Sequence, residues 1–485
     1  MLNYRIIARA FSGLIGLEAL LFLICWLVGI GYGESHHSTW IVPIGICTAL
    51  SLLLGILAGK GPTHFERRDG FFIVAIVWII YGILGMLPFL FGGHMLRPSA
   101  AFFEAMSGFT TTGSTAFTNI DVLPHSILLW RSITHWVGGM GIIFFTLALL
   151  PALGIGEQEL FSAEATGLKL GKLHSRVSTT AHYLWSTYLL ITIACAISYR
   201  LCGMNTFDAI NHSFSTIATG GFSTHTASIA HFNSPAIEYV SVFFMFLSSV
   251  NFSLLYFMIF KQRFRLLWKD EELRLFITFI ILFTTTCTLS QWWHSGDPSE
   301  HGFRESLFYV TSMMSTTGFT TENFMQWPHL TWISLILVSI MGACAGSTAG
   351  GVKTVRILTA IKVMRTEVRR ILHPRAVLPL RINNDYLTTD VLQSIFAYIC
   401  CYLFLMIVGI SIFVMLGYPV FDSFGLSIST FCNVGPGIGY SLGPLDSWSE
   451  LPDLGLWLSS FLMLAGRLEI FGLLLPFTPS FWRDN

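Results

Sequence analysis

Four short stretches of the chain combine small, mostly hydroxylic or amide residues with a glycine and carry no charged residue. They occupy residues 110–113, 217–220, 315–318 and 432–435, at nearly regular intervals. Glycine tolerates positive φ angles, so it can turn successive backbone carbonyls toward one axis. Four such loops around an axis can replace the water shell of an alkali cation with carbonyl and hydroxyl oxygens. The candidate ligands are Thr111, Thr112, Gly113, Ala218, Thr219, Gly220, Thr316, Thr317, Gly318, Asn433, Val434 and Gly435.

Aligning the four stretches on these glycines reveals a weak internal repeat. Serine occurs three times at the position six residues before the glycine, and an apolar residue occurs every time eleven residues before it. The first set is Ser107, Phe214, Ser312 and Ser429, and the second is Phe102, Ala209, Leu307 and Phe424. A single Thr-Gly pair is equally compatible with close packing of small residues between membrane helices. Four of them at the same place in four apolar hairpins favour the cation site.

The elements that must position these loops are helices in a membrane. Hydrophobic residues make up 53% of the chain, charged residues 11%, and the mean hydropathy is +0.66, whereas soluble domains carry about 25% charged residues. The 27 basic and 27 acidic residues balance, so no net charge favours nucleic acid as a partner. We expect an all-α integral membrane protein with about ten spans of roughly 20 residues, at 10–30, 41–59, 71–92, 127–151, 180–202, 236–260, 274–294, 329–343, 391–416 and 454–477.

Four shorter segments lie between paired spans and predict half-helices that enter and leave the membrane from one side. They are residues 98–111, 205–217, 303–316 and 419–431. Their C-terminal ends, which carry roughly half a negative charge each, would point toward the cation. Basic residues cluster at Arg5 and Arg9 and within 60–68, 169–176, 261–269 and 353–381, which predicts a cytoplasmic location for these stretches. The basic stretches all face the cytoplasm, in agreement with the number of spans between them, only if each half-helix enters and leaves the membrane from the outer side.

The N-terminal apolar run follows basic residues, as in a signal peptide. It extends from residue 10 to residue 30, which is long enough to span, and it has no clear small-x-small cleavage site. We therefore expect it to be retained as a helix.

On these motifs the chain resembles the membrane subunits of Trk-type bacterial potassium uptake systems, in the superfamily that also holds Ktr and plant and fungal relatives. The resemblance covers residues 70–480, and residues 1–60 resemble the extra two-helix domain of the Trk branch. It implies four covalently linked helix–pore loop–helix repeats around one pore, a selectivity filter with one glycine per repeat, and a homodimer. Four glycines imply potassium, with rubidium or sodium as further permeant ions. The fourth loop departs from the pattern most, because it has Asn433-Val434 in place of Thr-Thr. We expect this difference to weaken discrimination against sodium.

The expected domains follow from this resemblance. They are residues 1–60, the N-terminal two-helix domain; 61–155, repeat 1 with its filter near 110–114; 156–265, repeat 2 with its filter near 217–221; 266–375, repeat 3 with its filter near 315–319 and a gate loop at 342–353; and 376–485, repeat 4 with its filter near 432–436.

The gate loop is predicted from a glycine-rich stretch in an apolar span. Residues 342–351 hold Gly342, Gly346, Gly350 and Gly351, and each glycine costs a helix about 1 kcal/mol relative to alanine. Non-helical backbone at membrane depth is tolerated only against protein or a water-filled cavity. A close helix crossing is the alternative. The stretch resembles the family's intramembrane loop, which implies a gate formed by Gly346, Ser347, Thr348, Gly350, Gly351 and Lys353.

Arg467 is the only basic residue in the last expected span. It resembles the family's arginine that lines the pore below the filter. The alternative is an ion pair with an acidic residue of another helix, because Glu469 lies two positions on and faces another side of the helix. Arg131 and His135, at the start of an earlier span, are expected to be interfacial anchors.

The basic run 353–375 suits either anionic lipid headgroups or a regulatory partner. The resemblance implies a soluble nucleotide-binding ring subunit, since the chain has neither GxGxxG after a strand nor GxxxxGK[ST]. The nine cysteines form no metal or redox motif, and no nucleophile–base pair predicts an enzyme. We therefore expect gated potassium uptake by a multi-pass protein of the bacterial inner membrane, without a resident cofactor. The alternative is a secondary symporter that couples potassium to sodium or protons, although such folds usually have inverted repeats.

Overall fold

The computed structural model describes residues 2–59, 67–141, 177–376, 378–383 and 385–483. Within them the chain is mostly helical, as predicted, with one short strand hairpin. The α-helices are α1 (Tyr4–Gly31), α2 (Ser38–Ala58), α3 (Arg67–Gly85), α4 (Leu87–Phe91), α5 (Pro98–Phe109), α6 (His125–Gly139), α9 (Val177–Leu201), α10 (Thr206–Ile217), α11 (Pro235–Ser248), α12 (Phe252–Lys261), α13 (Phe264–Lys269), α14 (Glu271–Ser295), α15 (Glu300–Met314), α16 (His329–Met341), α17 (Thr354–Leu372), α18 (Thr389–Met415), α19 (Val420–Phe431), α20 (Asp453–Arg467), α21 (Phe471–Leu474) and α22 (Pro479–Trp482). The remaining elements are the 3-10 helices η1 (Ser228–Phe232), η2 (Phe324–Gln326), η3 (Trp448–Glu450) and η4 (Leu475–Phe477), and strands β1 (Arg381–Ile382) and β2 (Asp385–Tyr386).

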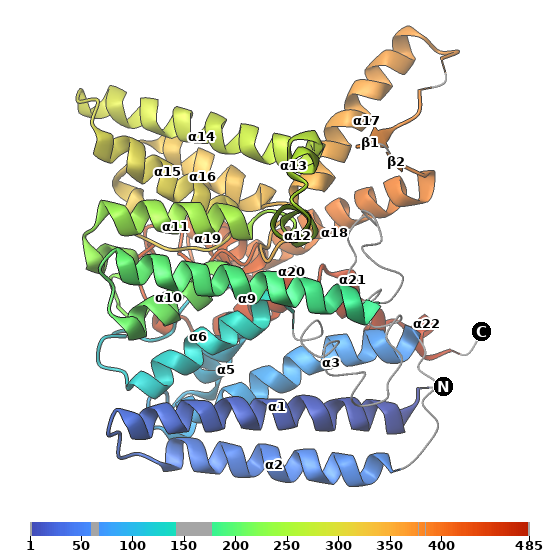
Figure 1. Ribbon diagram of the computed structural model, residues 1–485. Helices are drawn as coiled ribbons and strands as arrows, with labels where there is room; N and C mark the ends of the chain where they lie inside the picture. Colours follow the sequence, from blue (N-terminus) through green and yellow to red (C-terminus); the bar gives the residue numbers. More distant parts are fainter. Residues whose placement is uncertain (1, 60–66, 142–176, 377, 384, 484–485) are drawn as a thin grey trace.

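Helices α1 and α2 lie side by side along one edge of the molecule (Figure 1). Small residues let them approach closely, because Gly16 faces Ser51 and Gly55 faces Ser12. The hydroxyl of Ser12 donates to the Ser51 carbonyl at 2.8 Å, and that of Ser51 donates to the Ser12 carbonyl at 2.7 Å. Helix α1 packs in turn on α3 and α6, so the pair supports the helices around the first glycine loop.

After this pair, one order of elements occurs four times: a long helix, a short helix, a loop and a second helix. The four sets are α3–α5–α6, α9–α10–α11, α14–α15–α16 and α18–α19–α20. The short helices confirm the predicted half-helical segments to within three residues at each end. Each second helix packs on the short helix of the following set, and the last returns to the first: α6 on α10, α11 on α15, α16 on α19 and α20 on α5. The four sets therefore close into a ring.

Six of the described helices are long and apolar enough to cross a membrane, or up to eight if each of two bent helix pairs counts as one span. The bent pairs are α11 with α12, at 102°, and α20 with residues 471–477, at 110°. The expected continuous spans 236–260 and 454–477 are thus wrong. Helix α6 also ends early, at Gly139, and residues 142–151 of its expected span lie outside the described residues.

The breaks fall where the second helices approach the ends of the short helices. A Cβ atom on Gly138 would lie less than 3.0 Å from the Phe109 carbonyl oxygen, and one on Gly466 would lie less than 3.0 Å from that of Phe431. Ser248, the last residue of α11, donates its hydroxyl to the Thr216 carbonyl at 3.3 Å. Such a close backbone approach requires glycine or a small polar residue, and it is at these positions that the chain leaves the helix.

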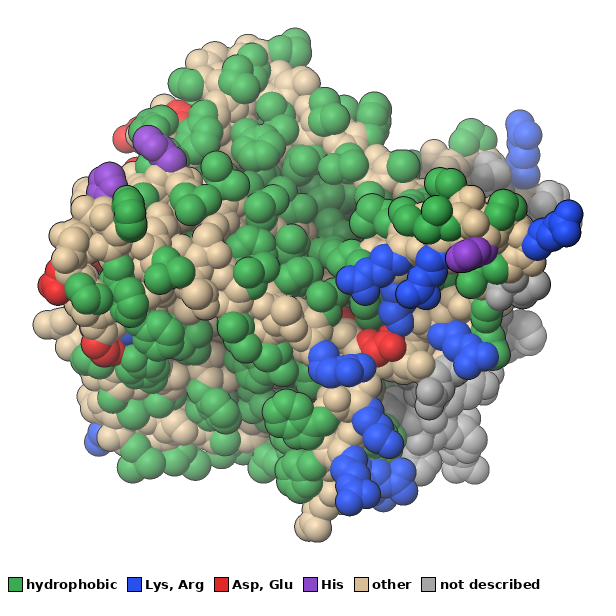
Figure 2. Space-filling view, turned by 90° about the horizontal axis from the view of Figure 1, so that it is seen from above, with side chains coloured by type: hydrophobic (Ala, Val, Ile, Leu, Met, Phe, Trp, Pro, Cys, Tyr) green, Lys and Arg blue, Asp and Glu red, His purple; other side chains and the backbone are tan. Residues whose placement is uncertain are grey.

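Helix α17 projects from the helical body at the end where both chain termini lie (Figure 1). Lys and Arg side chains gather at this end, whereas hydrophobic side chains cover the middle of the same face (Figure 2). Lys362 of α17 forms an ion pair with Glu271 of α14 and donates to the Arg381 carbonyl at 2.6 Å. The basic residues predicted to be cytoplasmic at 60–66 and 169–176 lie outside the described residues.

Candidate functional site

The four short helices end in loops with one shared backbone path. In each, a residue with left-handed φ is followed by a residue whose φ is not positive and then by a glycine with positive φ. The left-handed residues are Thr111, Thr219, Thr316 and Asn433, at 53°, 54°, 56° and 57°, and the glycines are Gly113, Gly221, Gly318 and Gly435, at 86°, 83°, 76° and 105°. A non-glycine residue in a sparsely populated conformation costs about 1–3 kcal/mol and persists only where its surroundings enforce it.

One hydrogen bond recurs in all four loops. The residue before each glycine donates its backbone N–H to the carbonyl of a serine in the last turns of the short helix. The pairs are Thr112 to Ser107, Gly220 to Ser215, Thr317 to Ser312 and Val434 to Ser429, at 2.8 or 2.9 Å. This bond across a left-handed residue is the Schellman arrangement that closes helix C-termini. It fixes the same loop geometry four times.

The second loop corrects the sequence alignment by one residue. Its structural equivalent of Gly113 is Gly221 rather than Gly220, because Thr219 takes the left-handed conformation and Gly221 has the positive φ. Gly220 occupies the place of Thr112, and Ala218 lies before the shared path. With this register, Ser215 replaces Phe214 in the aligned set, so serine occurs in all four loops.

Backbone contacts join the four loops into a closed ring. A Cβ atom on any of the four glycines would lie less than 3.0 Å from a carbonyl oxygen of the next loop. The contacts run from Gly113 to Gly220 O, from Gly221 to Thr317 O, from Gly318 to Val434 O and from Gly435 to Thr112 O. No side chain fits at these positions. The same arrangement places one backbone carbonyl of each loop, at an equivalent position, against the glycine of a neighbouring loop.

The glycine-rich segment 342–353 is not helical, as predicted, and lies against this ring. Helix α16 ends at Met341 and α17 begins at Thr354, with positive φ at Gly342, Gly346, Gly351 and Lys353. The Thr348 hydroxyl donates to the Ile217 carbonyl at 3.1 Å, and the Gly350 N–H donates to the Thr316 hydroxyl at 2.7 Å. Gly350 also lies against the Cys432 carbonyl. The segment thus contacts the ends of three of the four short helices.

Arg467, the last residue of α20, joins this segment to α6. Its guanidinium donates to the Thr348 carbonyl at 2.6 Å, to the Gly138 carbonyl at 2.6 Å and to the Gly139 carbonyl at 3.0 Å. The partners come from the segment and from the broken end of α6, so one cation lies where two sets of helices meet below the loops. Nearby, Lys353 donates to the Ala349 carbonyl, and Glu469 pairs with Arg356 of α17.

Comparison with known proteins assigns this geometry to a family. The family model TrkH, described as a cation transport protein, matches residues 36–483. The chain belongs to the TrkH family. Family members are transporters, which confirms the expectation that the chain is not an enzyme and the resemblance to Trk-type membrane subunits.

The relatives of this TrkH-family chain match it from end to end. The Trk system potassium uptake protein TrkH of Escherichia coli K12 is 37% identical over 483 residues, which cover 98% of this chain and 99% of the relative. That of Vibrio parahaemolyticus is 36% identical over 489 residues and 100% of both chains. The crystal structure of the potassium transporter TrkH from Vibrio parahaemolyticus matches with a TM-score of 0.89 and 35% identity, covering 99% of this chain and 100% of that one.

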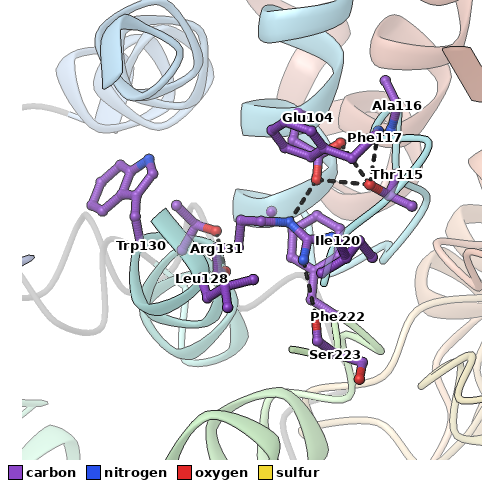
Figure 3. A network of polar contacts seen from close by, with 12 residues as sticks. Glu104, Thr115, Ala116, Phe117, Ile120, Leu128, Trp130, Arg131, Phe222 and Ser223 are labelled. Atoms are coloured by element: carbon purple, nitrogen blue, oxygen red, sulfur yellow. Dashed lines mark hydrogen bonds and ion pairs between the residues drawn. The ribbon is translucent and has the colours of Figure 1, made fainter. Parts of the chain in front are cut away.

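A buried ion pair braces the first two loops of the TrkH-family ring (Figure 3). Arg131 Nε lies 2.8 Å from Glu104 Oε1, and the two side chains are 1% and 0% exposed. Glu104 accepts from the Ala116 N–H at 2.8 Å, while Arg131 donates to the Ser223 carbonyl at 2.9 Å and lies 4.0 Å from the centre of the Phe222 ring. The expectation that Arg131 is an interfacial anchor is therefore wrong, because its partner on α5 draws it into the core.

His135 is likewise buried rather than interfacial. Its Nδ1 lies 2.8 Å from the Gly108 carbonyl, and its Nε2 accepts from the Phe222 N–H at 3.1 Å. An imidazole that accepts at Nε2 carries its proton on Nδ1, so the ring is neutral and links the first short helix to the second loop.

Each loop is also held by a buried carboxylate of its own short helix, which the sequence reasoning missed. Glu104 accepts from Thr115, Asp208 from Thr224, and Glu305 from Thr321. Asp422 accepts from the backbone of Tyr440 and Ser441 at 2.8 and 3.1 Å. With the corrected register, Asp208, Glu305 and Asp422 each stand thirteen residues before their glycine. The spacing shared by Glu305 and Asp422, which needs no correction of the register, is the signal that would have found these two.

Proposed function

We propose that this TrkH-family protein takes up potassium across the bacterial inner membrane through the ring of four loops. The observation that carries the proposal is the closed set of contacts between the four glycines and the carbonyls of Thr112, Gly220, Thr317 and Val434. Four equivalent carbonyls around one axis can replace the water shell of an alkali ion. The names of the relatives, Trk system potassium uptake proteins, support potassium as the permeant ion, with rubidium and sodium as poorer ones.

Electrostatics favour a cation at this place. All four short helices end at the ring, so four helix C-termini, each with roughly half a negative charge, surround it. The loops hold no charged side chain, and the ligands are therefore backbone and hydroxyl oxygens. In the structural register the proposed filter comprises Thr111, Thr112, Gly113, Thr219, Gly220, Gly221, Thr316, Thr317, Gly318, Asn433, Val434 and Gly435.

The proposal extends to the organisation of the chain. Residues 1–60 form an N-terminal two-helix domain, and residues 61–155, 156–265, 266–375 and 376–485 form four helix–pore loop–helix repeats around one pore. The four-fold order of elements and the ring of contacts between sets support this division. Two such chains form a homodimer in the bilayer.

Segment 342–353 and Arg467 act as the gate in this account. Thr348 and Gly350 lie against the inner ends of the short helices, and Arg467 ties Thr348 to α6. The segment continues directly into α17. Glu272 of α14 accepts from the backbone N–H groups of both Ala345, at 2.6 Å, and Val355, at 3.0 Å. A displacement of α17 is therefore transmitted to the segment.

A cytoplasmic nucleotide-binding ring subunit is the proposed source of that displacement. Helix α17 projects from the body, and its exposed residues include Arg365, Arg369 and Arg370. The chain contains no nucleotide-binding motif of its own. An acidic surface on a soluble partner fits this basic helix, and energy for gating would come from the partner.

The alternative, a secondary symporter that couples potassium to sodium or protons, has one observation in its favour. Helices broken within the membrane line the substrate site of many symporters, and two helix pairs here are bent by 102° and 110°. A symporter would stop moving potassium when the coupling gradient is removed. A gated pore would continue to follow the potassium gradient alone.

Reversal potentials of purified protein in liposomes test the proposal, with potassium, rubidium and sodium varied. The Gly113→Ser variant should lose at least tenfold in potassium over sodium permeability, because its side chain meets the Gly220 carbonyl. Gly296→Ser is the matched control: Gly296 also has positive φ, at 71°, but no atom lies within 4 Å of its Cβ position. Unchanged permeability ratios in Gly113→Ser would remove the filter assignment.

A further inference from the structure

Two histidines and an aspartate meet in the loops that follow the first two glycines. Asp121 precedes α6, His225 follows Gly221, and His231 lies in η1. One ligand atom from each of the three lies within 4.8 Å of the others. Asp121 Oδ1 is 3.0 Å from His225 Nδ1, and the two imidazole rings are stacked 3.5 Å apart at 4°.

We propose that Asp121, His225 and His231 bind a transition-metal ion of the zinc class. Two imidazoles and one carboxylate form the donor set that zinc prefers, with a water molecule as fourth ligand. Around a tetrahedral ion with ligand distances of about 2.0–2.2 Å, neighbouring ligand atoms lie about 3.3–3.6 Å apart. The separation of Asp121 Oδ1 and His225 Nδ1 is close to that value. His231 is exposed, and a rotation of its side chain out of the stack with His225 would direct a ring nitrogen to the ion.

A second carboxylate orients His225 for this role. Asp208 Oδ2 lies 3.1 Å from His225 Nε2, and Thr224 donates to the other oxygen of Asp208 at 2.6 Å. Metal-binding histidines almost always donate their second ring N–H to a carboxylate or carbonyl, which directs the other nitrogen to the metal. Here Asp208 engages Nε2 of His225, so the ion would bind at Nδ1 and replace the present contact of Nδ1 with Asp121.

Asp121 is held in place by its own hydrogen bonds. The Thr226 N–H donates to Asp121 Oδ2 at 3.3 Å, and His225 Nδ1 lies 3.0 Å from Asp121 Oδ1.

A related cluster in the third set supplies a contrast. His301, Glu305 and Glu322 also place ligand atoms within 4.8 Å of one another, and Glu322 stands at the same distance after its glycine as His225 does. This cluster has only one imidazole, and its other two donors are carboxylates. The pair of histidines is what selects zinc over calcium or magnesium, which prefer oxygen ligands.

A bound ion would add positive charge four residues after Gly221 and would tie together the loops that follow the first two glycines. Zinc applied on the side of these loops should therefore lower potassium flux, a consequence that rests on the proposed function. Zinc binding itself does not rest on the proposed function, because it is measured without any flux.

Equilibrium titration of the full chain in nanodiscs, purified with a histidine-free tag, tests the site. Zinc is competed against a chromophoric chelator, and cobalt is added separately to record its visible absorption. We expect one site of micromolar affinity that His231→Ala weakens at least tenfold, with loss of the tetrahedral cobalt spectrum. His301→Ala at the second cluster should leave both readouts unchanged, and thermal melting verifies that both variants fold.

Two binding results would overturn the site: no saturable zinc binding below about 1 mM, or unchanged affinity and cobalt spectrum in His231→Ala. Flux is then measured separately in liposomes with zinc on the loop side. Zinc that binds but leaves flux of the unaltered protein at its zinc-free level would overturn the effect on transport. If the unaltered protein did not select potassium, the proposed function would be wrong, but the zinc-binding result would remain valid.

Discussion

The ring and the region directly beneath it differ in how far the four sets of helices agree. In the ring, Thr112, Gly220, Thr317 and Val434 make the same hydrogen bond and face the same kind of neighbour. Beneath it, three residues separate α11 from α12, and three separate α20 from α21. By contrast, the twelve residues of segment 342–353 separate α16 from α17. The repeated part suits ion recognition, which needs equal ligands around an axis. The unequal part suits regulation, which needs one element that can move.

The comparison predicts that damage to the ring and its braces impairs stability or ion preference, whereas damage beneath it changes rate alone. The largest effect is expected for Glu104→Gln. It leaves the buried Arg131 without its counter-charge, and removal of one partner from a buried pair costs about 3–5 kcal/mol. Thermal melting of the purified variant should show a large loss of stability. Glu367→Gln, from an exposed pair with Arg370, should melt as the unaltered protein does; equal melting of both variants would deny the brace.

Gly221→Ser should lower potassium over sodium permeability at least tenfold, as much as Gly113→Ser does. Its φ is 83° and its Cβ would meet the Thr317 carbonyl. The measurement is the bi-ionic reversal potential in liposomes. Gly417→Ser is a matched control, since Gly417 has φ of 96° and open space around its Cβ position. A retained permeability ratio in Gly221→Ser would show that the loops do not act as one ring.

Deletion of residues 346–349 should raise basal potassium flux several-fold and leave the permeability ratio unchanged. The deletion removes Thr348 and its contacts with the end of α10, but no residue of the ring. Flux is normalised to folded protein in the liposomes. A variant that folds, inserts and conducts no faster would identify the segment as a packing element.

Arg467→Ala should increase flux by a smaller factor than the deletion does. At roughly 6 Å and an effective dielectric constant near 20, a fixed charge opposes a permeating cation by about 3 kcal/mol. The carbonyls of Thr348, Gly138 and Gly139 offset part of it. The increase should be largest at low ionic strength, and Arg467→Lys should restore most of the unaltered rate. Normal or reduced flux per folded Arg467→Ala molecule would assign the residue a purely structural role.

The sequence predicted the elements of the ring well because its signals are local. Glycine after small, mostly hydroxylic or amide residues marks the loops, and the length of the apolar runs separates short helices from spans. The register of the second loop was wrong because residues 220 and 221 are both glycine, and only the backbone shows which one needs positive φ. Thr219 holds the left-handed conformation that a sequence pattern would assign to glycine.

The braces could not be predicted because they depend on contacts between distant residues. Arg131 looks like an interfacial anchor until Glu104 is seen beside it. The breaks after α11 and α20 occur at Ser249 and Leu468, residues that are compatible with a continuing helix. Their cause is the neighbouring short helix, whose position no local pattern reveals.

Anomalous diffraction from crystals grown in rubidium tests the central claim most directly, because it locates the permeant ion without relying on transport. The account predicts a rubidium peak on the axis of the ring, enclosed by the carbonyl oxygens of Thr112, Gly220, Thr317 and Val434. Sodium should weaken this peak only when it is present in high excess over rubidium. Rubidium bound elsewhere in the helical body, with no peak inside the ring, would contradict it.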